Sequence, residues 1–170
     1  PVVPPTEDRV ARVLEYLKLP ADTEIAELPP MRGVATVEKI AVNAVMAGCL
    51  PEYVPVVIAA VEAIAEPQFN LQSLETSTGG CAVATVVNGP IRKALDVNYG
   101  RNCMNPGRRS NATIGRAIRL IIMNIGGASP EKVLKLRILD PACGSGSFLL
   151  GAFQYLMDWH LRYYSAAKDP

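Results

Sequence analysis

Residues 111–127 read NATIGRAIRLIIMNIGG and carry the clearest helical pattern in the chain. The aliphatic positions recur three and four residues apart, which is the spacing of one helix face. The glycine pair at 126–127 ends the pattern, because glycine readily adopts the left-handed conformation that closes many helices. We therefore predict an amphipathic helix over residues 111–125, whose buried face holds Ile114, Ile118, Ile121, Ile122 and Ile125.

Other segments on both sides of this stretch show helical signals. Residues 6–19 place aliphatic side chains on one face behind a capping Thr6, and Pro20 ends them. The patterns at 34–48 and 52–65 are apolar on an inward face, and Gly48 ends the first of the two. We also expect a short helical piece at 90–95 and a long helix, apolar around most of its circumference, at 147–164.

Short β-branched segments predict strands. Residues 71–77 and 81–87 flank a glycine pair and are predicted to form two strands, and residues 136–139 (LRIL) a further one. Residues 21–33 and 98–110 are typical of connections, because they are rich in Pro, Gly and Asn. The sequence therefore predicts an α+β N-terminal domain over 1–130 and a β-strand–Gly loop–α-helix unit over 131–170.

The composition excludes several classes of protein. The chain has 170 residues, of which 49% are apolar and 19% charged, and its net charge is +1. Intrinsic disorder needs low hydrophobicity and high net charge, and a nucleic-acid-binding surface usually needs a basic excess, so neither is expected. The longest apolar stretch, 53–65, contains Glu62 and is too short to cross a bilayer. Composition does not set the oligomeric state.

The cysteine pattern argues against a metal site. The four cysteines stand at positions 49, 81, 103 and 143, no CxxC pair occurs, and His160 is the only histidine. These spacings do not fit zinc or a disulfide framework, so we expect no metal and reduced thiols. Acidic residues stand near the N-terminus where a secretory signal would be basic, which favours a cytoplasmic protein.

Residues 136–150 read LRILDPACGSGSFLL and combine a short strand, a glycine loop and a helix start. Gly144 and Gly146 would let the backbone approach a ligand, and the N–H groups of the following helix would point at it. An ordinary glycine turn between a strand and a helix has the same pattern, so both interpretations stay open.

The string DPACGSGSF closely resembles motif I of the S-adenosylmethionine-dependent N6-adenine DNA methyltransferases of restriction-modification and phage-defence systems. The resemblance covers residues 136–170 and implies the start of a Rossmann-like α/β methyltransferase sheet that binds S-adenosylmethionine. Asp140, Ala142, Gly144 and Gly146 would contact the methionine part of this donor, with Phe148 packing beneath the loop. The cofactor-binding set that the resemblance implies is Asp140, Pro141, Ala142, Cys143, Gly144, Ser145, Gly146 and Phe148.

One motif of that family is missing. The string (Asn/Asp/Ser)-Pro-Pro-(Tyr/Phe), with which these enzymes clamp the flipped adenine, does not occur in the sequence. We therefore expect a fragment of a DNA adenine-N6 methyltransferase that is inactive alone, with DNA as a partner only in a complete methyltransferase domain.

Residues 4–130 resemble the domain of the (seleno)cysteine-Gly-Ser-Cys (UGSC) motif family. The matching strings are ATVEKIAVNAVMAGCLPEY (35–53), FNLQ (69–72), VNGPI (87–91) and NPGRRSNATIGRAIRL (105–120). The last string departs from the family's usual Gly-Pro-Gly-Asn-Arg-Ala-Asn at its first, fourth and sixth positions. The resemblance implies a small-molecule enzyme module of redox or sulfur/selenium type, with a polar site formed by Glu38, Lys39, Asn43, Asn88, Arg109 and Asn111.

The residues themselves suggest two polar sites in this region. Lys39 and Asn43 share a helix face with Glu38 beside them, and they either line a polar pocket or form a solvated face, which is commoner. The pair Arg108-Arg109 precedes a helix start and either binds a small anion or stays solvated. The candidate anion or substrate residues are Glu38, Lys39, Asn43, Asn88, Arg108, Arg109, Asn111 and Thr113.

Three hypotheses about function follow from the sequence. The chain is a fragment of a DNA adenine methyltransferase, or a small-molecule or anion-binding module carried by residues 1–130, or a non-functional chimeric reading frame. Cys49 is expected to be buried and unreactive in each case, because the negative end of a helix dipole raises a thiol pKa.

Overall fold

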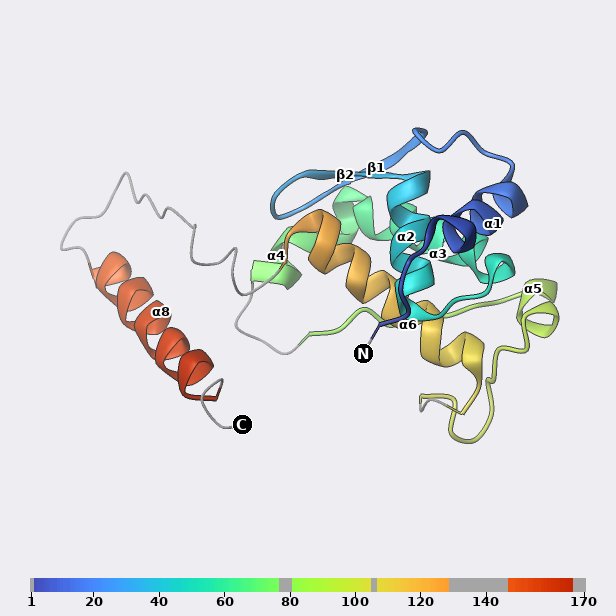
Figure 1. Cartoon of the computed structure of the whole chain (residues 1–170). Helices are drawn as coiled ribbons and strands as arrows, with labels where there is room; N and C mark the ends of the chain where they lie inside the picture. Colours follow the sequence, from blue (N-terminus) through green and yellow to red (C-terminus); the bar gives the residue numbers. More distant parts are fainter. Residues whose placement is uncertain (1, 77–80, 105–106, 129–146, 167–170) are drawn as a thin grey trace. The chain divides into compact units, whose positions relative to one another are not determined.

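The computed structural model describes residues 2–76, 81–104, 107–128 and 147–166. The chain divides into two compact units, Pro1–Val133 and Leu134–Pro170. The described element of the second unit is α8(Ser147–Ala166). The first unit contains, in order, α1(Glu7–Leu17), β1(Glu24–Leu28), β2(Gly33–Thr36), α2(Val37–Ala47), η1(Pro51–Tyr53), α3(Val54–Ala65), η2(Pro67–Phe69), α4(Leu71–Thr76), α5(Pro90–Ala94), α6(Arg109–Ile121) and the π-helix η3(Ile122–Gly126) (Figure 1).

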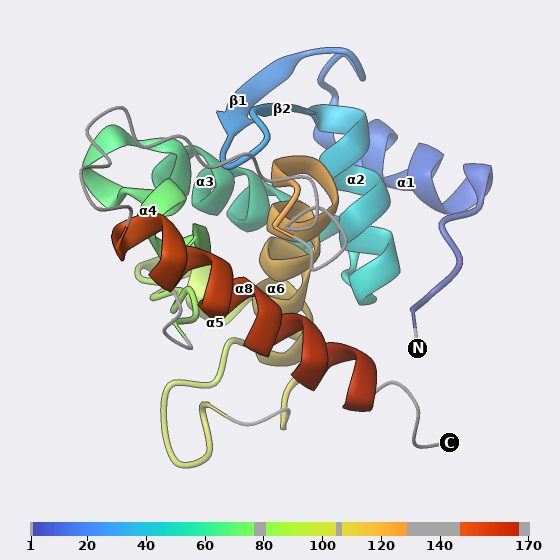
Figure 2. The ribbon, with the colours of Figure 1, turned by 90° about the vertical axis from the view of Figure 1, so that its left-hand side faces the viewer.

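Helix α6 and the π-helix η3 form the centre of the first unit. The amphipathic helix expected at 111–125 is confirmed, although its last turn widens into η3. Ile114, Ile118, Ile121 and Ile122 are buried, as their spacing predicted. Helices α2 and α3 pack against α6 and against each other (Figures 1 and 2). These three helices supply most of the aliphatic core, to which α1 adds Val10 and Val13 and the hairpin adds Leu28 and Ala35.

Local capping fixes where α2 begins and ends. The Thr36 side chain accepts a hydrogen bond from the Lys39 backbone N–H at 3.4 Å. At the other end Gly48 has a φ of 92°, and its N–H bonds to the Ala44 and Val45 carbonyls. The prediction that Gly48 ends this helix is confirmed, and the left-handed turn there sends the chain toward α3.

Strands β1 and β2 form an antiparallel hairpin that pairs Leu28 with Gly33. The sequence indicated a connection over 21–33, so this hairpin was missed. Its strands are short, and Leu28 and Ala35 are fully buried, so packing holds them in place. The hairpin contacts α3 through β1 and η3 through both strands, and it lies over one end of the helices (Figure 2).

The predicted fold, an α+β domain followed by the start of a Rossmann-like α/β sheet, is wrong for the part of the chain that the structure describes. These residues are mostly helical, and their sheet is the two-stranded antiparallel pair β1–β2. A parallel sheet needs several strands joined by crossover helices and covered on both faces, and nothing in the described ranges supplies them. The strand expected at 136–139 lies outside the described residues.

The strand pair expected at 71–77 and 81–87 is also wrong. Residues Leu71–Thr76 form helix α4, where Leu71 is buried, and residues 81–88 form neither helix nor strand. Val83 packs against the core without a neighbouring strand to pair with. The β-branched composition of this segment does not produce a strand in the described structure, because a strand needs a partner ladder as well as β propensity.

Helix α8 was expected at 147–164 and is observed at Ser147–Ala166. Its described side chains include the exposed Leu150, Phe153, Met157 and Leu161, which share one face. Gln154 donates a hydrogen bond to Asp158 one turn later at 2.9 Å. Among the described residues no single helix meets the length and hydropathy needed to cross a membrane, and the pair Pro51–Ala65 and Pro67–Glu75 meets them only across a 72° bend.

Candidate functional site

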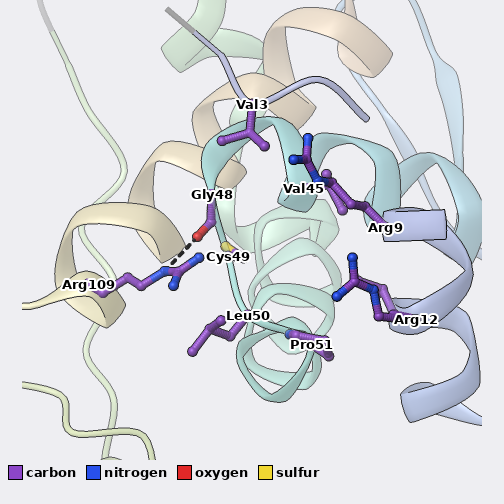
Figure 3. A pocket seen from close by; sticks show the side chains of 10 residues that line it. Val3, Arg9, Arg12, Val45, Gly48, Cys49, Leu50, Pro51 and Arg109 are labelled. Atoms are coloured by element: carbon purple, nitrogen blue, oxygen red, sulfur yellow. Dashed lines mark hydrogen bonds between the residues drawn. The ribbon is translucent and has the colours of Figure 1, made fainter. Parts of the chain in front are cut away.

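A cavity of about 190 Å³ opens between α1, the end of α2 and the start of α6 (Figure 3). We call it the arginine pocket, because guanidinium groups from two helices line it. The N-terminal segment closes one side, where the Val3 N–H bonds to the Met46 carbonyl at 3.0 Å. The pocket is lined by Val3, Arg9, Arg12, Val13, Val45, Gly48, Cys49, Leu50, Pro51 and Arg109.

Three arginines approach this pocket from opposite sides. Arg9 and Arg12 stand one turn apart on α1, and Arg109 is the first residue of α6 (Figure 3). Each is anchored to a main-chain carbonyl: Arg9 to Pro4 at 2.8 Å, Arg12 to Asp8 at 3.3 Å and Arg109 to Gly48 at 3.0 Å. A guanidinium has five N–H donors, so each of these side chains keeps donors for a ligand.

The charge of the pocket is not balanced by its lining. None of the described residues that line the pocket carries a carboxylate. The ion pairs among the described residues are Arg32–Glu27, Arg108–Asp96 and Arg119–Glu75, and none of them uses a pocket arginine. Three positive charges that converge on one cavity favour an anion, because guanidinium groups form strong charge-assisted hydrogen bonds with anionic oxygens.

Cys49 lies at the base of this pocket and is buried, with 8% of its surface exposed. Its thiol donates a hydrogen bond to the Thr113 carbonyl at 3.4 Å. Burial raises the pKa of Cys49 to about 11, against the smaller lowering effects of the Thr113 contact and the Arg109 charge. The expectation of a buried cysteine is confirmed, and the raised pKa favours the protonated thiol at neutral pH.

The rates of thiol labelling will distinguish the buried Cys49 from the exposed Cys81. At pH 8 in the folded protein, we expect the exposed Cys81 to react with an aromatic disulfide reagent at least about a hundredfold faster than Cys49. The reason is that both the pKa and the burial of Cys49 suppress thiolate attack. Peptide mass spectrometry over time measures the two rates, and urea should equalise them. Equal rates in the folded protein would contradict the buried placement.

The two arginines of the anion site expected at the start of α6 have different partners. Arg108 pairs with Asp96 at 2.9 Å, while Arg109 turns toward the arginine pocket. Asn111 accepts a hydrogen bond from the Asn98 N–H at 2.8 Å and donates to the Asn98 and Cys103 carbonyls. These residues order the loop before α6, so the two arginines act in different places.

The remaining contacts at the start of α6 are also local. Ser110 donates to the Asp96 carbonyl at 2.9 Å, and the Thr113 hydroxyl donates to the Arg109 carbonyl at 2.8 Å. Arg92 stacks over the Tyr99 ring at 3.6 Å from its centroid, which further holds this loop. Of the candidate residues at the start of α6, Arg109 alone lines the arginine pocket.

The other candidates lie elsewhere. Glu38, Lys39 and Asn43 line a second cavity of about 330 Å³ together with Asn124, and we call this cavity the amide pocket. Asn88 is exposed beside an apolar groove along α3. The implied donor-binding residues 140–146 lie outside the described residues, as does the side chain of Phe148. The structure thus divides the expected polar site among separate places.

Sequence reasoning missed Arg9, Arg12 and Asn124. The two arginines stand three positions apart on α1, which would have indicated a common face. Asn124 interrupts a run of isoleucine and methionine, which was a sign of a specific polar contact. Among the described ranges, no group of three or more His, Cys, Asp or Glu side chains comes together as a metal site.

The comparisons with known proteins identify no family for this chain. No family model, no curated protein and no solved structure matches the chain. The two sequence resemblances therefore stay predictions, and the pockets are interpreted from their own geometry.

Proposed function

We propose that the first unit is a binding domain for a small anion, held in the arginine pocket. The observation that carries this proposal is the convergence of Arg9, Arg12 and Arg109 on one cavity without a carboxylate in its lining. The expected class of ligand bears a phosphate, sulfate or carboxylate group, because guanidinium donors match the oxygen geometry of these anions.

The size of the pocket limits the ligand. Its volume of about 190 Å³ is below the range of about 300–1,000 Å³ that is usual for sites of drug-sized ligands. A single oxyanion or one anionic head group fits this space better than a complete cofactor. The apolar residues Val3, Val13 and Leu50 would cover the ligand and strengthen its contacts with the arginines.

The lining favours binding over thiol chemistry. Besides the arginines, Cys49 is the titratable group of the lining, and its pKa is raised to about 11 by burial. A protonated, buried thiol is neither a nucleophile nor a redox centre near neutral pH. This geometry supports an anion-binding module more than the redox or sulfur enzyme that the UGSC-like strings implied.

Binding of S-adenosylmethionine by residues 140–148 remains a separate proposal. It is supported by the DPACGSGSF string and by helix α8, which begins at Ser147 within that string. A helix N-terminus after a glycine loop suits a charged ligand. We propose no methyl transfer to DNA by this chain, because the adenine-clamping string does not occur in it.

Removing two of the pocket arginines will weaken anion binding. We expect the Arg9→Gln/Arg12→Gln double variant to bind phosphate or sulfate at least about tenfold more weakly. Each hydrogen bond to a charged group contributes about 1.5–3 kcal/mol, and tenfold corresponds to about 1.4 kcal/mol. Isothermal titration calorimetry at constant ionic strength, with chloride as the reference anion, measures the change.

Arg32→Gln is the matched control for this experiment. It makes one arginine-to-glutamine change in an exposed ion pair with Glu27, and neither of these two residues lines the arginine pocket. We expect it to leave anion affinity within about twofold of the parent, since surface charges are screened by salt. Equal losses in the control and the double variant, or no binding by the parent protein at 50 mM anion, would contradict the proposal.

A further inference from the structure

The π-helix η3 brings Asn124 against helix α2. The Asn124 side-chain N–H donates to Asn43 Oδ1 at 2.7 Å, and Asn43 in turn donates to the Lys39 carbonyl at 2.8 Å. Asn43 is only 4% exposed, so this amide chain forms a fixed floor beneath the amide pocket. Single π-helical turns within α-helices are rare and occur frequently at functional sites.

The hairpin β1–β2 holds one wall of the amide pocket in place. Gly33 contacts the Ile125 carbonyl so closely that a Cβ would clash with it. A Cβ on Gly126 would lie 2.6 Å from the Pro29 carbonyl oxygen, and the Met31 N–H bonds to the Gly126 carbonyl at 2.9 Å. These backbone contacts leave η3 little freedom, so the position of Asn124 is fixed from both sides.

The charged groups of the amide pocket have opposite signs. The Lys39 ammonium donates to the Val34 carbonyl at 2.8 Å, which leaves two of its three N–H donors for a ligand. Glu38 lines the same pocket, and among the described ion pairs neither it nor Lys39 takes part. The pocket therefore presents an ammonium, a carboxylate and an amide floor, unlike the wholly cationic arginine pocket.

We propose that the amide pocket binds a small zwitterion, such as a free amino acid, independently of the anion in the arginine pocket. Lys39 would bind the ligand's carboxylate, Glu38 its ammonium group, and Asn124 would offer its free carbonyl and remaining N–H to a polar side group. A simple anion would be repelled by Glu38, and a simple amine by Lys39. The volume of about 330 Å³ lies at the lower end of the range for small-ligand sites.

The test compares the binding of amino acids to the full chain with the binding of compounds that carry only one of the two charged groups. Glycine, L-alanine and L-glutamine are titrated to 10 mM, with propionate and ethylamine as the halves of alanine. Binding is followed by the NMR signals of the Asn124 side-chain amide. We expect at least one amino acid to shift these signals, and both halves of alanine to bind at least tenfold more weakly than the best amino acid.

Two charge-removing variants identify the site. We expect Lys39→Met and Glu38→Gln each to weaken amino-acid binding at least tenfold, whereas Lys93→Met, a matched change on α5, leaves it unchanged. The Arg9→Gln/Arg12→Gln protein should keep amino-acid binding and lose phosphate binding, which separates the two proposals. No amino-acid response at 10 mM, or unchanged affinity in Lys39→Met and Glu38→Gln, would overturn the zwitterion site.

Discussion

Gly33→Ala is expected to lower the free energy of unfolding by about 3 kcal/mol, at the upper end of usual overpacking costs. A Cβ at this position meets the main-chain carbonyl of Ile125, and a backbone atom in η3 cannot move aside as a flexible side chain can. Separation of the hairpin from η3 would relieve the clash, at the cost of the contacts around Leu28. Urea unfolding followed by circular dichroism measures the loss.

Gly115→Ala provides the matched control for this substitution. Gly115 lies on the exposed side of α6, and a Cβ there meets nothing within 4 Å. Alanine should therefore stabilise the helix by up to about 1 kcal/mol, because it has the higher helix propensity. If both alanine variants unfolded at the same urea concentration, the close contact between the hairpin and η3 would not exist in solution.

Helices α1, α2, α3 and α6 of the first unit could be predicted from the sequence because their signals are local, whereas α4 was predicted as a strand. The isoleucine spacing of α6 and the terminal Gly48 of α2 depend only on residues within a few turns. The π-helical end of α6 could not be predicted in this way. It depends on Gly126 packing against the Pro29 carbonyl, a contact between residues almost one hundred positions apart.

The β-structure was predicted in the wrong place because it too depends on contacts between segments and not only on local sequence. Residues 81–87 have strong β propensity but no partner strand in the described structure, while Glu24–Leu28 has a modest pattern and pairs with Gly33–Thr36. Strand formation depends on what lies beside and above a segment. The Rossmann-like expectation failed at this step, because a glycine motif indicates a possible loop but cannot supply the neighbouring strands.

The candidate sites also depend on residues that are far apart in the sequence. The spacing of Lys39 and Asn43 identified one wall of the amide pocket, but it could not decide between a pocket and a solvated face. That depends on Asn124, which stands 81 positions away and bonds to Asn43. The arginine pocket likewise combines α1 with the start of α6, so no local pattern around Arg109 could have indicated it.

Ile121→Ala is expected to lower the free energy of unfolding by about 3–4 kcal/mol, within the usual range for truncating a buried isoleucine. Ile121 is fully buried and is the last residue of α6 before η3. Truncation leaves a gap in the core that α6 forms with α2 and α3, and the fixed backbone of η3 prevents this gap from closing. The midpoint of urea unfolding should fall, while the slope stays unchanged if the folded state remains intact.

Two further variants decide whether this loss reflects a central core position. Ile121→Val removes a single methylene and should cost only about 0.5–1.5 kcal/mol. Ile91→Ala makes the same truncation on α5, where the side chain is 40% exposed, and should cost less than Ile121→Ala because part of the surface is already hydrated. A cost below about 1 kcal/mol for Ile121→Ala would show that α6 is not the helix on which the unit is built. A large loss for Ile121→Ala with smaller losses for the other two variants would instead indicate that both pockets depend on the stability of α6. Arg109 is the first residue of this helix, and Asn124 lies just after its last turn.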